Sequence, residues 1–249
     1  MELLDEIVEI VRECGEIILQ ADRNENVVTA KEGHANFVTV YDKKVQDILE
    51  RRLKELLPES RFVGEESNRK DAVGEGDVFI VDPIDGTTNF IKDYHASAIS
   101  VGMLRDGVPF LGVIYNPYLD EMYTALAGEG AFCNQKKICV SDKPLEKGIV
   151  LFGTSPYYEE LSHRSFDKAY EYFGKSMDLR RSGSAALDLC AIAAGRAELF
   201  FELRLQPWDY AAGALIVKEA GGRVVTEDGE EPVYDRPCSI FATNAVAEP

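Results

Sequence analysis

The chain has 249 residues, with 27 Lys and Arg against 44 Asp and Glu, so its formal net charge is −17. At about 150 residues per domain, this length allows one large domain or two closely packed halves. Apolar residues make up 45% of the chain, which excludes intrinsic disorder. The negative charge argues against a general binder of nucleic acids or anionic membranes, because their phosphates would be repelled. A phosphate-bearing substrate stays compatible where a bound cation reverses the local field.

Other classes of protein and site are also disfavoured. The N-terminus is acidic and lacks a basic segment followed by an apolar run, so no secretory signal peptide is expected. No apolar run approaches the ~20 residues that span a bilayer. With three histidines and five scattered cysteines, none in C-x-x-C spacing, a disulfide framework or a zinc site of Cys or His type is not expected. We therefore expect a cytoplasmic protein in a reducing compartment.

The first half of the chain predicts helices followed by an antiparallel sheet. Apolar residues at helical spacing predict helices over residues 3–18 and 42–57, with a polar loop at 31–36 between them. Short β-like runs follow at 61–64 and 78–81. The turn Arg105-Asp106-Gly107 predicts a hairpin, and the strands expected here cover residues 97–104, 108–115, 121–126 and 131–133.

The second half alternates between strands and helices. The predicted strands cover residues 148–152, 197–201, 223–226 and 239–242, and the predicted helices cover 157–173, 185–194 and 209–220. Gly221-Gly222 ends the last helix. We expect a single domain of mixed α/β or α+β class with two sheets, whose two halves, about 1–143 and 144–249, meet near 141–147.

The segment Val81–Phe90, with the sequence VDPIDGTTNF, carries the main chemical signal. An apolar strand is expected to end on Asp82, because Pro83 cannot donate to the next ladder position. Asp82 and Asp85 would then straddle a tight turn and converge on one hard cation, with the carbonyl of Ile84 as a further ligand. The small residues Gly86 and Thr87 let backbone N–H groups approach an anion. A metal site beside such amides suits hydrolysis of a phosphate ester.

Two further acidic positions strengthen this signal. Glu65-Glu66 closes a short strand, and Asp209 follows Trp208 at the start of a helix. Taken alone, each motif has a structural explanation: a solvated turn, a surface acidic pair, or a helix cap beside a core tryptophan. Together they gather carboxylates that are hard to neutralise without a cation.

These motifs resemble the inositol monophosphatase family. The resemblance covers nearly the whole chain. It is carried by Glu65-Glu66-Ser67, by the run from Val81 to Phe90, by Gly130–Asn134 and Arg181–Ala186, and by Trp208–Gly213. It implies a layered α-β-α-β-α sandwich and Mg²⁺-dependent, Li⁺-sensitive hydrolysis of a phosphate monoester, with myo-inositol 1-phosphate as the expected substrate. It also implies a homodimer or higher homo-oligomer that binds neither nucleic acid nor membrane.

The resemblance implies a role for each matching residue. Glu65, Asp82 and the Ile84 carbonyl would hold one metal ion, and Asp82, Asp85 and Asp209 a second. A third ion would bind near Glu65 through water. The hydroxyl of Thr87, with Asp42 behind it, would orient the attacking water, so the catalytic residues are Glu65, Thr87 and Asp42. The residues expected to contact the substrate are Asp85, Gly86, Thr87, Gly183, Ser184, Ala185, Glu202 and Asp209.

Some positions leave alternatives open. Asn36 stands where the family often has an acid, which weakens the case for the third ion, and Lys31 matches a family lysine or is an ordinary surface lysine. Arg181 and Arg204 are either ordinary surface residues or contacts for a second phosphate. The second interpretation would favour fructose-1,6-bisphosphatase or dual activity.

An alternative from a different class of function is binding to RNA polymerase, which is known for some bacterial relatives. Gly174-Lys175-Ser176 resembles the end of a P-loop, but Ala169 replaces its first glycine.

Overall fold

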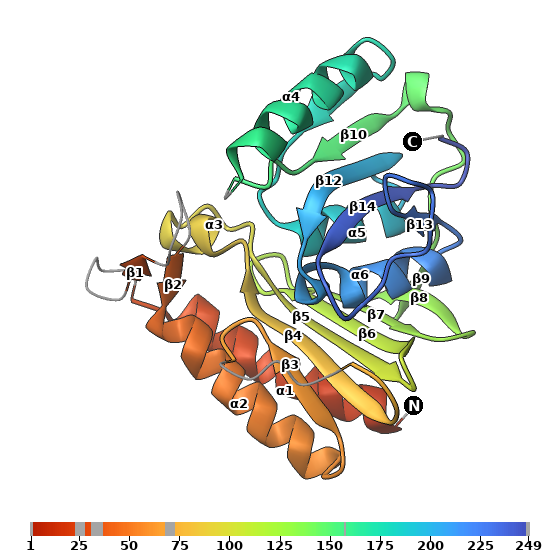
Figure 1. Ribbon diagram of the computed structural model, residues 1–249. Coiled ribbons are helices and arrows are strands. Elements are labelled where there is room, and N and C mark those ends of the chain that lie inside the picture. The colour runs from red at the N-terminus through yellow and green to blue at the C-terminus, as the bar shows by residue number, and fades with distance from the viewer. Residues whose placement is uncertain (1, 23–27, 31–36, 68–72, 157, 248–249) are drawn as a thin grey trace.

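Helices and sheets alternate in five layers in the computed structural model, which describes residues 2–22, 28–30, 37–67, 73–156 and 158–247 (Figure 1). Helices α1 and α2 cover one face of a seven-stranded sheet. Helices α5 and α6 lie between this sheet and a five-stranded sheet, whose outer face is covered by α4. The predicted α/β sandwich with two sheets is confirmed. None of the described helices has both the length and the apolar character needed to cross a membrane.

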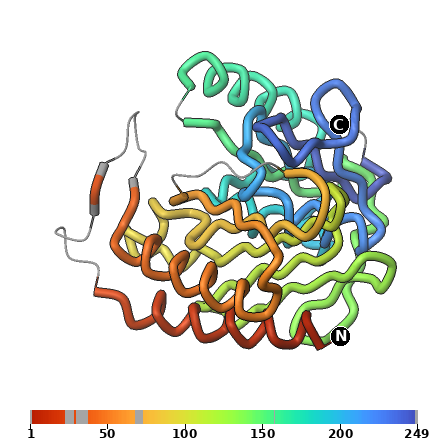
Figure 2. The backbone as a smooth tube through the Cα atoms, turned by 60° about the horizontal axis from the view of Figure 1, so that its bottom comes forward, coloured from red at the N-terminus to blue at the C-terminus, as the bar shows by residue number. Residues whose placement is uncertain are grey.

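The first layer consists of α1 (Glu2–Leu19) and α2 (Val40–Leu56), which lie side by side (Figure 2). Their apolar faces pack against the sheet, with residues such as Ile10 and Leu49 fully buried. Helix α2 begins two residues earlier than predicted because Thr39 caps it. The Thr39 hydroxyl accepts hydrogen bonds from the backbone of Tyr41 and Asp42, and the Asp42 carboxylate accepts one from the Thr39 N–H.

The seven-stranded sheet runs in the order β3-β4-β5-β6-β7-β8-β9 and is antiparallel except for the β3–β4 pair. Its strands are β3 (Arg61–Gly64), β4 (Asp77–Asp85), β5 (Ala98–Arg105), β6 (Val108–Asn116), β7 (Glu121–Leu126), β8 (Gly130–Cys133) and β9 (Lys136–Ile138). The predicted β5–β6 hairpin is confirmed, and positive φ angles at Asp106 (51°) and Gly107 (79°) suit a tight hairpin turn. Strand β9 was not predicted, because it holds a single apolar residue.

Strand β4 differs from the prediction at the point that matters for the site. It does not end on Asp82 but continues through Pro83 to Asp85. Its pairing with β5 shifts on the way, from Asp82 opposite Ser100 to Asp85 opposite Ala98. Three steps along β4 therefore match two along β5, which is a bulge. The lost N–H of Pro83 falls within this irregular stretch, so the two aspartates are separated by a bulge instead of a turn.

The five-stranded sheet has the order β11-β10-β12-β14-β13 and mixes parallel and antiparallel pairs. Its strands are β10 (Ile149–Phe152), β11 (Asp178–Arg180), β12 (Leu199–Leu205), β13 (Arg223–Val225) and β14 (Cys238–Thr243), and α4 spans Glu159–Phe173. Strand β12 begins two residues later than predicted and extends to Leu205, so Glu202 lies within it. Outside the layers are the antiparallel pair β1 (Val28–Ala30) and β2 (Phe37–Thr39) and the short 3₁₀ helix η2 (Leu145–Lys147).

Helices α5 (Ala185–Ala193) and α6 (Pro207–Glu219) fill the middle layer with small residues. Gly102 and Gly112 face each other across β5 and β6, and α6 lies directly on them. A Cβ atom at Gly102 would come within 3.0 Å of the Ala211 side chain, and one at Gly112 within 2.8 Å of the Ala212 carbonyl oxygen. Since no large side chain intervenes, the N-terminal half of α6 is held close to the sheet.

This contact predicts that Gly112→Ala destabilises the fold. The new methyl group would press on the Ala212 carbonyl, and overpacking of this kind costs about 1–3 kcal/mol of unfolding free energy. Urea denaturation followed by circular dichroism measures the loss. The matched control is Gly174→Ala, because the nearest atom there is 3.9 Å away and its φ is −75°. Equal stability of Gly112→Ala and the parent chain would contradict this account.

Candidate active site

Three aspartates converge at one end of the middle layer. Asp82 and Asp85 come from the end of β4, and Asp209 comes from the first turn of α6. One carboxylate oxygen from each lies within 4.8 Å of those of the other two. Asp82 is 2% exposed and Asp85 8% exposed, so most of their surface is removed from water. The β4 bulge and the close approach of α6 to the sheet together bring the three side chains to one point.

Neighbouring donors hold each carboxylate in place. Asp82 Oδ1 accepts a hydrogen bond from the Ile84 N–H at 3.0 Å, and Asp209 Oδ2 accepts one from the Gln206 N–H at 2.7 Å. Asp85 Oδ2 accepts from the Ala186 N–H at 2.9 Å and from the Ser184 hydroxyl. These bonds use one oxygen of each aspartate. The other oxygen of each side chain leaves lone pairs that suit a hard cation.

Burial raises the pKa of all three carboxyls. Burial raises the pKa of Asp85 to about 6. Burial also raises the pKa of Asp82 and of Asp209 well above their ordinary value, and neighbouring carboxylates, including Glu65, raise both further. Ionised carboxylates in this arrangement repel one another and lack water, so a divalent cation would relieve both costs. The all-oxygen donor set fits Mg²⁺.

Glu65 lies beside this group of three aspartates, which we call the aspartate triad. It follows β3 and lines the same pocket as Asp82 and Asp209. Its N–H donates to the Val81 carbonyl at 3.1 Å, which keeps the end of β3 against β4. The structure therefore brings together the four acidic side chains that the sequence analysis expected to bind metal.

Thr87 and Asp42 also meet, as expected. The Thr87 hydroxyl lies 3.1 Å from the Ile84 carbonyl oxygen and 3.4 Å from Asp42 Oδ1. A hydroxyl donates one proton, so it can serve one of these acceptors at a time while its oxygen accepts from another molecule. Asp42 is fully buried, and its pKa is raised by burial and by Glu66 against the lowering effect of the Thr39 hydrogen bonds.

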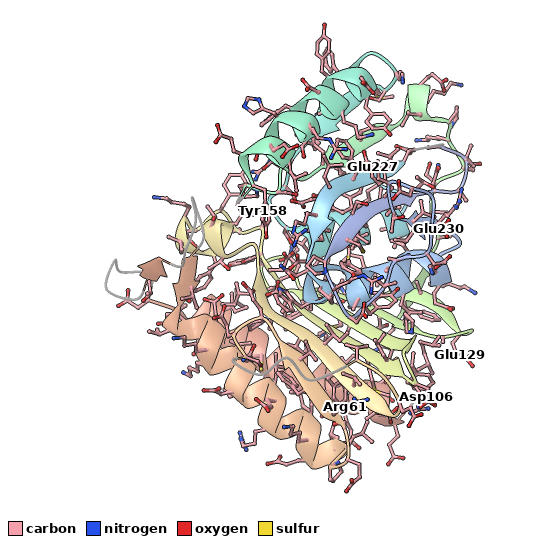
Figure 3. All side chains as sticks on the ribbon, in the orientation of Figure 1. Arg61, Asp106, Glu129, Tyr158, Glu227 and Glu230 are labelled. Carbon is pink, nitrogen blue, oxygen red and sulfur yellow. The ribbon has the colours of Figure 1, made fainter. Side chains whose placement is uncertain are left out.

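A pocket of 750 Å³ opens from the triad toward the second sheet. The expected substrate residues Gly86, Thr87, Gly183, Ser184, Ala185 and Glu202 all line it. Glu202 accepts a hydrogen bond from the Ser155 N–H at 2.8 Å, and burial raises its pKa to about 7. Figure 3 shows Tyr158 close to the start of α4. Tyr158 and Arg204 both line this pocket, with the Arg204 guanidinium 4.9 Å from the centre of the Tyr158 ring.

Several pocket residues were missed as site residues by the sequence analysis. Asn89 donates to the Ala96 carbonyl at 2.7 Å and to the Ser182 carbonyl at 2.9 Å, so it ties α3 (Thr87–Ile91) to the segment before α5. Asp188 on α5 is a buried carboxyl that also lines the pocket. Asn89 belongs to the motif that was recognised, whereas Asp188 looks like an ordinary helical residue. Lys31 and Asn36 lie outside the described residues.

Comparison with known proteins gives one consistent result. The family model described as "Inositol monophosphatase family" matches residues 1–248. Inositol monophosphatase 2 of Solanum lycopersicum is 37% identical, over 98% of this chain and 94% of that protein. Nus factor SuhB of Vibrio cholerae is 36% identical, over 97% and 91%. The solved structure of SaIMPase-II with inositol monophosphate bound has a TM-score of 0.84 and 30% identity, covering 99% of this chain and 90% of that one.

The triad predicts that the metal-free protein loses stability as the pH rises. A carboxyl whose pKa is higher in the folded than in the unfolded chain stabilises the fold when protonated, and this contribution is lost as the pH passes through the folded pKa. For Asp85, stability is lost over the pH range from 3.8, its ordinary pKa, to about 6, its pKa in the folded chain. The raised pKa values of Asp82 and Asp209 extend this pH range upward. Asp82→Asn should therefore raise the melting temperature of the metal-free protein at pH 7, on the order of 3 °C or more.

The same substitution should have a smaller effect at pH 4, where the parent carboxyl is already protonated. Asp47→Asn is the matched control, since it removes one charge from the exposed face of α2. Thermal melts in the presence of a chelator measure both variants. A lower melting temperature for Asp82→Asn at pH 7 would contradict the electrostatic cost assigned to the triad.

Proposed function

The chain belongs to the inositol monophosphatase family, and we propose that it releases phosphate from myo-inositol 1-phosphate by Mg²⁺-dependent attack of water. Members of this family are metal-dependent phosphatases that act on phosphate esters. The observation that carries the proposal is the aspartate triad with Glu65 beside it, a set of buried and half-buried carboxylates at the end of a pocket large enough for a cyclic polyol phosphate.

The carboxylate and carbonyl oxygens of the site would form two metal positions. Glu65, Asp82 and the Ile84 carbonyl would hold one Mg²⁺, and the aspartate triad would hold another, with Asp82 shared between them. A third ion near Glu65 is part of the same proposal. When bound, the metal lowers the pKa of a water molecule and stabilises negative charge on the phosphate and on the leaving oxygen. No histidine base is needed for this chemistry.

Thr87 would orient the attacking water. Its hydroxyl donates to Asp42 or to the Ile84 carbonyl, so its oxygen is directed to accept a hydrogen bond from that water. Because Asp42 is fixed by the backbone and hydroxyl of Thr39, this orientation is set by the start of α2. Asp42 thus acts through Thr87 instead of contacting the phosphate.

The phosphate and the polyol would be held by different parts of the pocket. Gly86 has a φ of 85°, and a Cβ there would come within 3.0 Å of the Ala96 carbonyl and 3.2 Å of the Gly183 carbonyl. A side chain at this position would therefore collide with the surrounding backbone. The N–H groups of Gly86 and Thr87, two residues that line the pocket, would donate to the phosphate. On the other side, Glu202 and the segment 183–185 would accept and donate hydrogen bonds to the ring hydroxyls.

Other attributes of the proposal follow from family membership. We expect inhibition by Li⁺, a homodimer or higher homo-oligomer, and a location in the cytoplasm. One similar protein is named a Nus factor. A role limited to binding would not require the metal-binding carboxylates, and this chain retains Glu65, Asp82, Asp85 and Asp209 together with Thr87.

A second candidate is fructose 1,6-bisphosphate, alone or alongside the inositol ester. Arg181 and Arg204 both line the pocket. Arg181 donates to the Thr154 hydroxyl at 3.1 Å, and Arg204 lies 4.9 Å from the centre of the Tyr158 ring. In the described part of the chain, neither has a carboxylate partner within 4.0 Å. Two such cations are suited to a second phosphate.

The main proposal predicts that Asp82→Asn abolishes phosphate release. Loss of a ligand shared by two metal positions should lower kcat by a factor of about 1000 or more while the chain remains folded. Release of inorganic phosphate from myo-inositol 1-phosphate, measured with and without Mg²⁺, is the test, and circular dichroism confirms folding. Absence of Mg²⁺-dependent release from any inositol or sugar phosphate by the folded parent chain would refute the proposed activity.

The second candidate predicts a substrate-dependent effect of the pocket arginines. Arg204→Ala and Arg181→Ala should lower kcat/KM for fructose 1,6-bisphosphate by roughly tenfold each, because a charge-assisted hydrogen bond is lost, and affect myo-inositol 1-phosphate less. Arg223→Ala is the control, since Arg223 is exposed and lies outside the pocket. Equal losses for both substrates would exclude a subsite for a second phosphate.

A further inference from the structure

Two adjacent glutamates follow β3, and they have different surroundings. Glu65 lines the pocket and raises the pKa of Asp82 and Asp209. Glu66 raises the pKa of Asp42 instead. Consecutive side chains in such a turn leave the backbone in different directions, so the position of the turn decides which carboxylate reaches the triad.

The turn is anchored by the side chain of Gln46 from α2. Gln46 is 4% exposed, its Oε1 accepts a hydrogen bond from the Glu66 N–H at 2.8 Å, and its Nε2 lies 3.4 Å from the Ser67 hydroxyl. The Ser67 N–H closes the turn onto the Gly64 carbonyl at 3.1 Å. A Cβ at Gly64 would come within 2.2 Å of Gln46 Oε1, so the glycine gives the amide access to the turn.

Helix α2 thereby supports two parts of the site at once. Asp42 and Gln46 are four residues apart, which places them on the same face of the helix. Asp42 lies against Thr87, and Gln46 holds the turn that carries Glu65. The helix is fixed in turn by its buried apolar face, to which Val45 and Leu49 belong.

We propose that Gln46 is a positioning residue that directs Glu65 toward the metal site by accepting the Glu66 N–H. The inference rests on the proposed function, because it takes Glu65 as a metal ligand. An amide also supplies this acceptor without a further negative charge close to Asp42 and Asp82, whose carboxyls already carry the cost of burial.

The test is direct Mg²⁺ binding by isothermal titration calorimetry to the full chain and three variants. Gln46→Leu removes the acceptor and should weaken Mg²⁺ binding by roughly fivefold to tenfold, the value of one hydrogen bond. Gln46→Glu keeps an acceptor for the Glu66 N–H, so it should bind Mg²⁺ at least as tightly as the parent chain. Leu49→Ala, a buried apolar substitution in the same helix, should lower the melting temperature but weaken Mg²⁺ binding much less than Gln46→Leu, because the hydrogen bond to the Glu66 N–H is kept.

Kinetics provide a second measurement. At saturating Mg²⁺, Gln46→Leu should recover most of the parent kcat, and its KM for the phosphate ester should change less than its Mg²⁺ requirement. Parent-like Mg²⁺ affinity in folded Gln46→Leu would overturn the inference, as would equal weakening in Gln46→Glu or Leu49→Ala. If the parent chain itself binds no Mg²⁺ and releases no phosphate, the proposed function fails as well, so the two failures are distinguishable.

Discussion

The site depends on three carboxylates of like charge that the fold holds close together. Asp82, Asp85 and Asp209 are brought together although burial raises the pKa of each, and neighbouring carboxylates raise the pKa of Asp82 and Asp209 further. Their arrangement depends on interactions made elsewhere: the β4 bulge, the hydrogen bonds from backbone N–H groups, and the apolar packing that holds α6 on the sheet. The fold is therefore electrostatically unfavourable at the point where the proposed cation would bind, and a bound cation would relieve this cost.

The site draws on segments that are distant in the chain. The first half supplies the acidic end of β4, while the segment before α5, the middle of β12 and the start of α6 supply the opposite wall. Asn89 and the Ser184–Asp85 hydrogen bond connect these two sides directly. The pocket shares the negative sign of the net charge of −17, because six acidic side chains line it, but Arg181 and Arg204 line it as well.

Much of the fold and of the candidate site could be predicted from the sequence, and the failures have physical causes. Periodic apolar residues identified the long helices and the central strands. The spacing of Asp82 and Asp85 linked these two acids, and the family resemblance added Asp209. Strands β9 and β11 are short and polar, so periodicity does not reveal them. The extension of β4 past Pro83 depends on a bulge, which is a property of strand pairing. Gln46 acquires its contact through the packing of α2 beside β3, which no local pattern encodes.

The contact of α6 with Gly102 and Gly112 has a consequence for how the site tolerates change over evolution. The backbone of α6 packs directly on the backbone of the sheet at these glycines. The distance between Asp209 and β4 is therefore set by backbone contact and does not depend on side-chain rotamers. Substitutions elsewhere along α6 can accumulate without altering the distance between Asp209 and β4. A larger residue at either glycine would push α6 away from the sheet and increase the distance between Asp209 and β4. The geometry of the aspartate triad therefore depends partly on two residues that have no side chain.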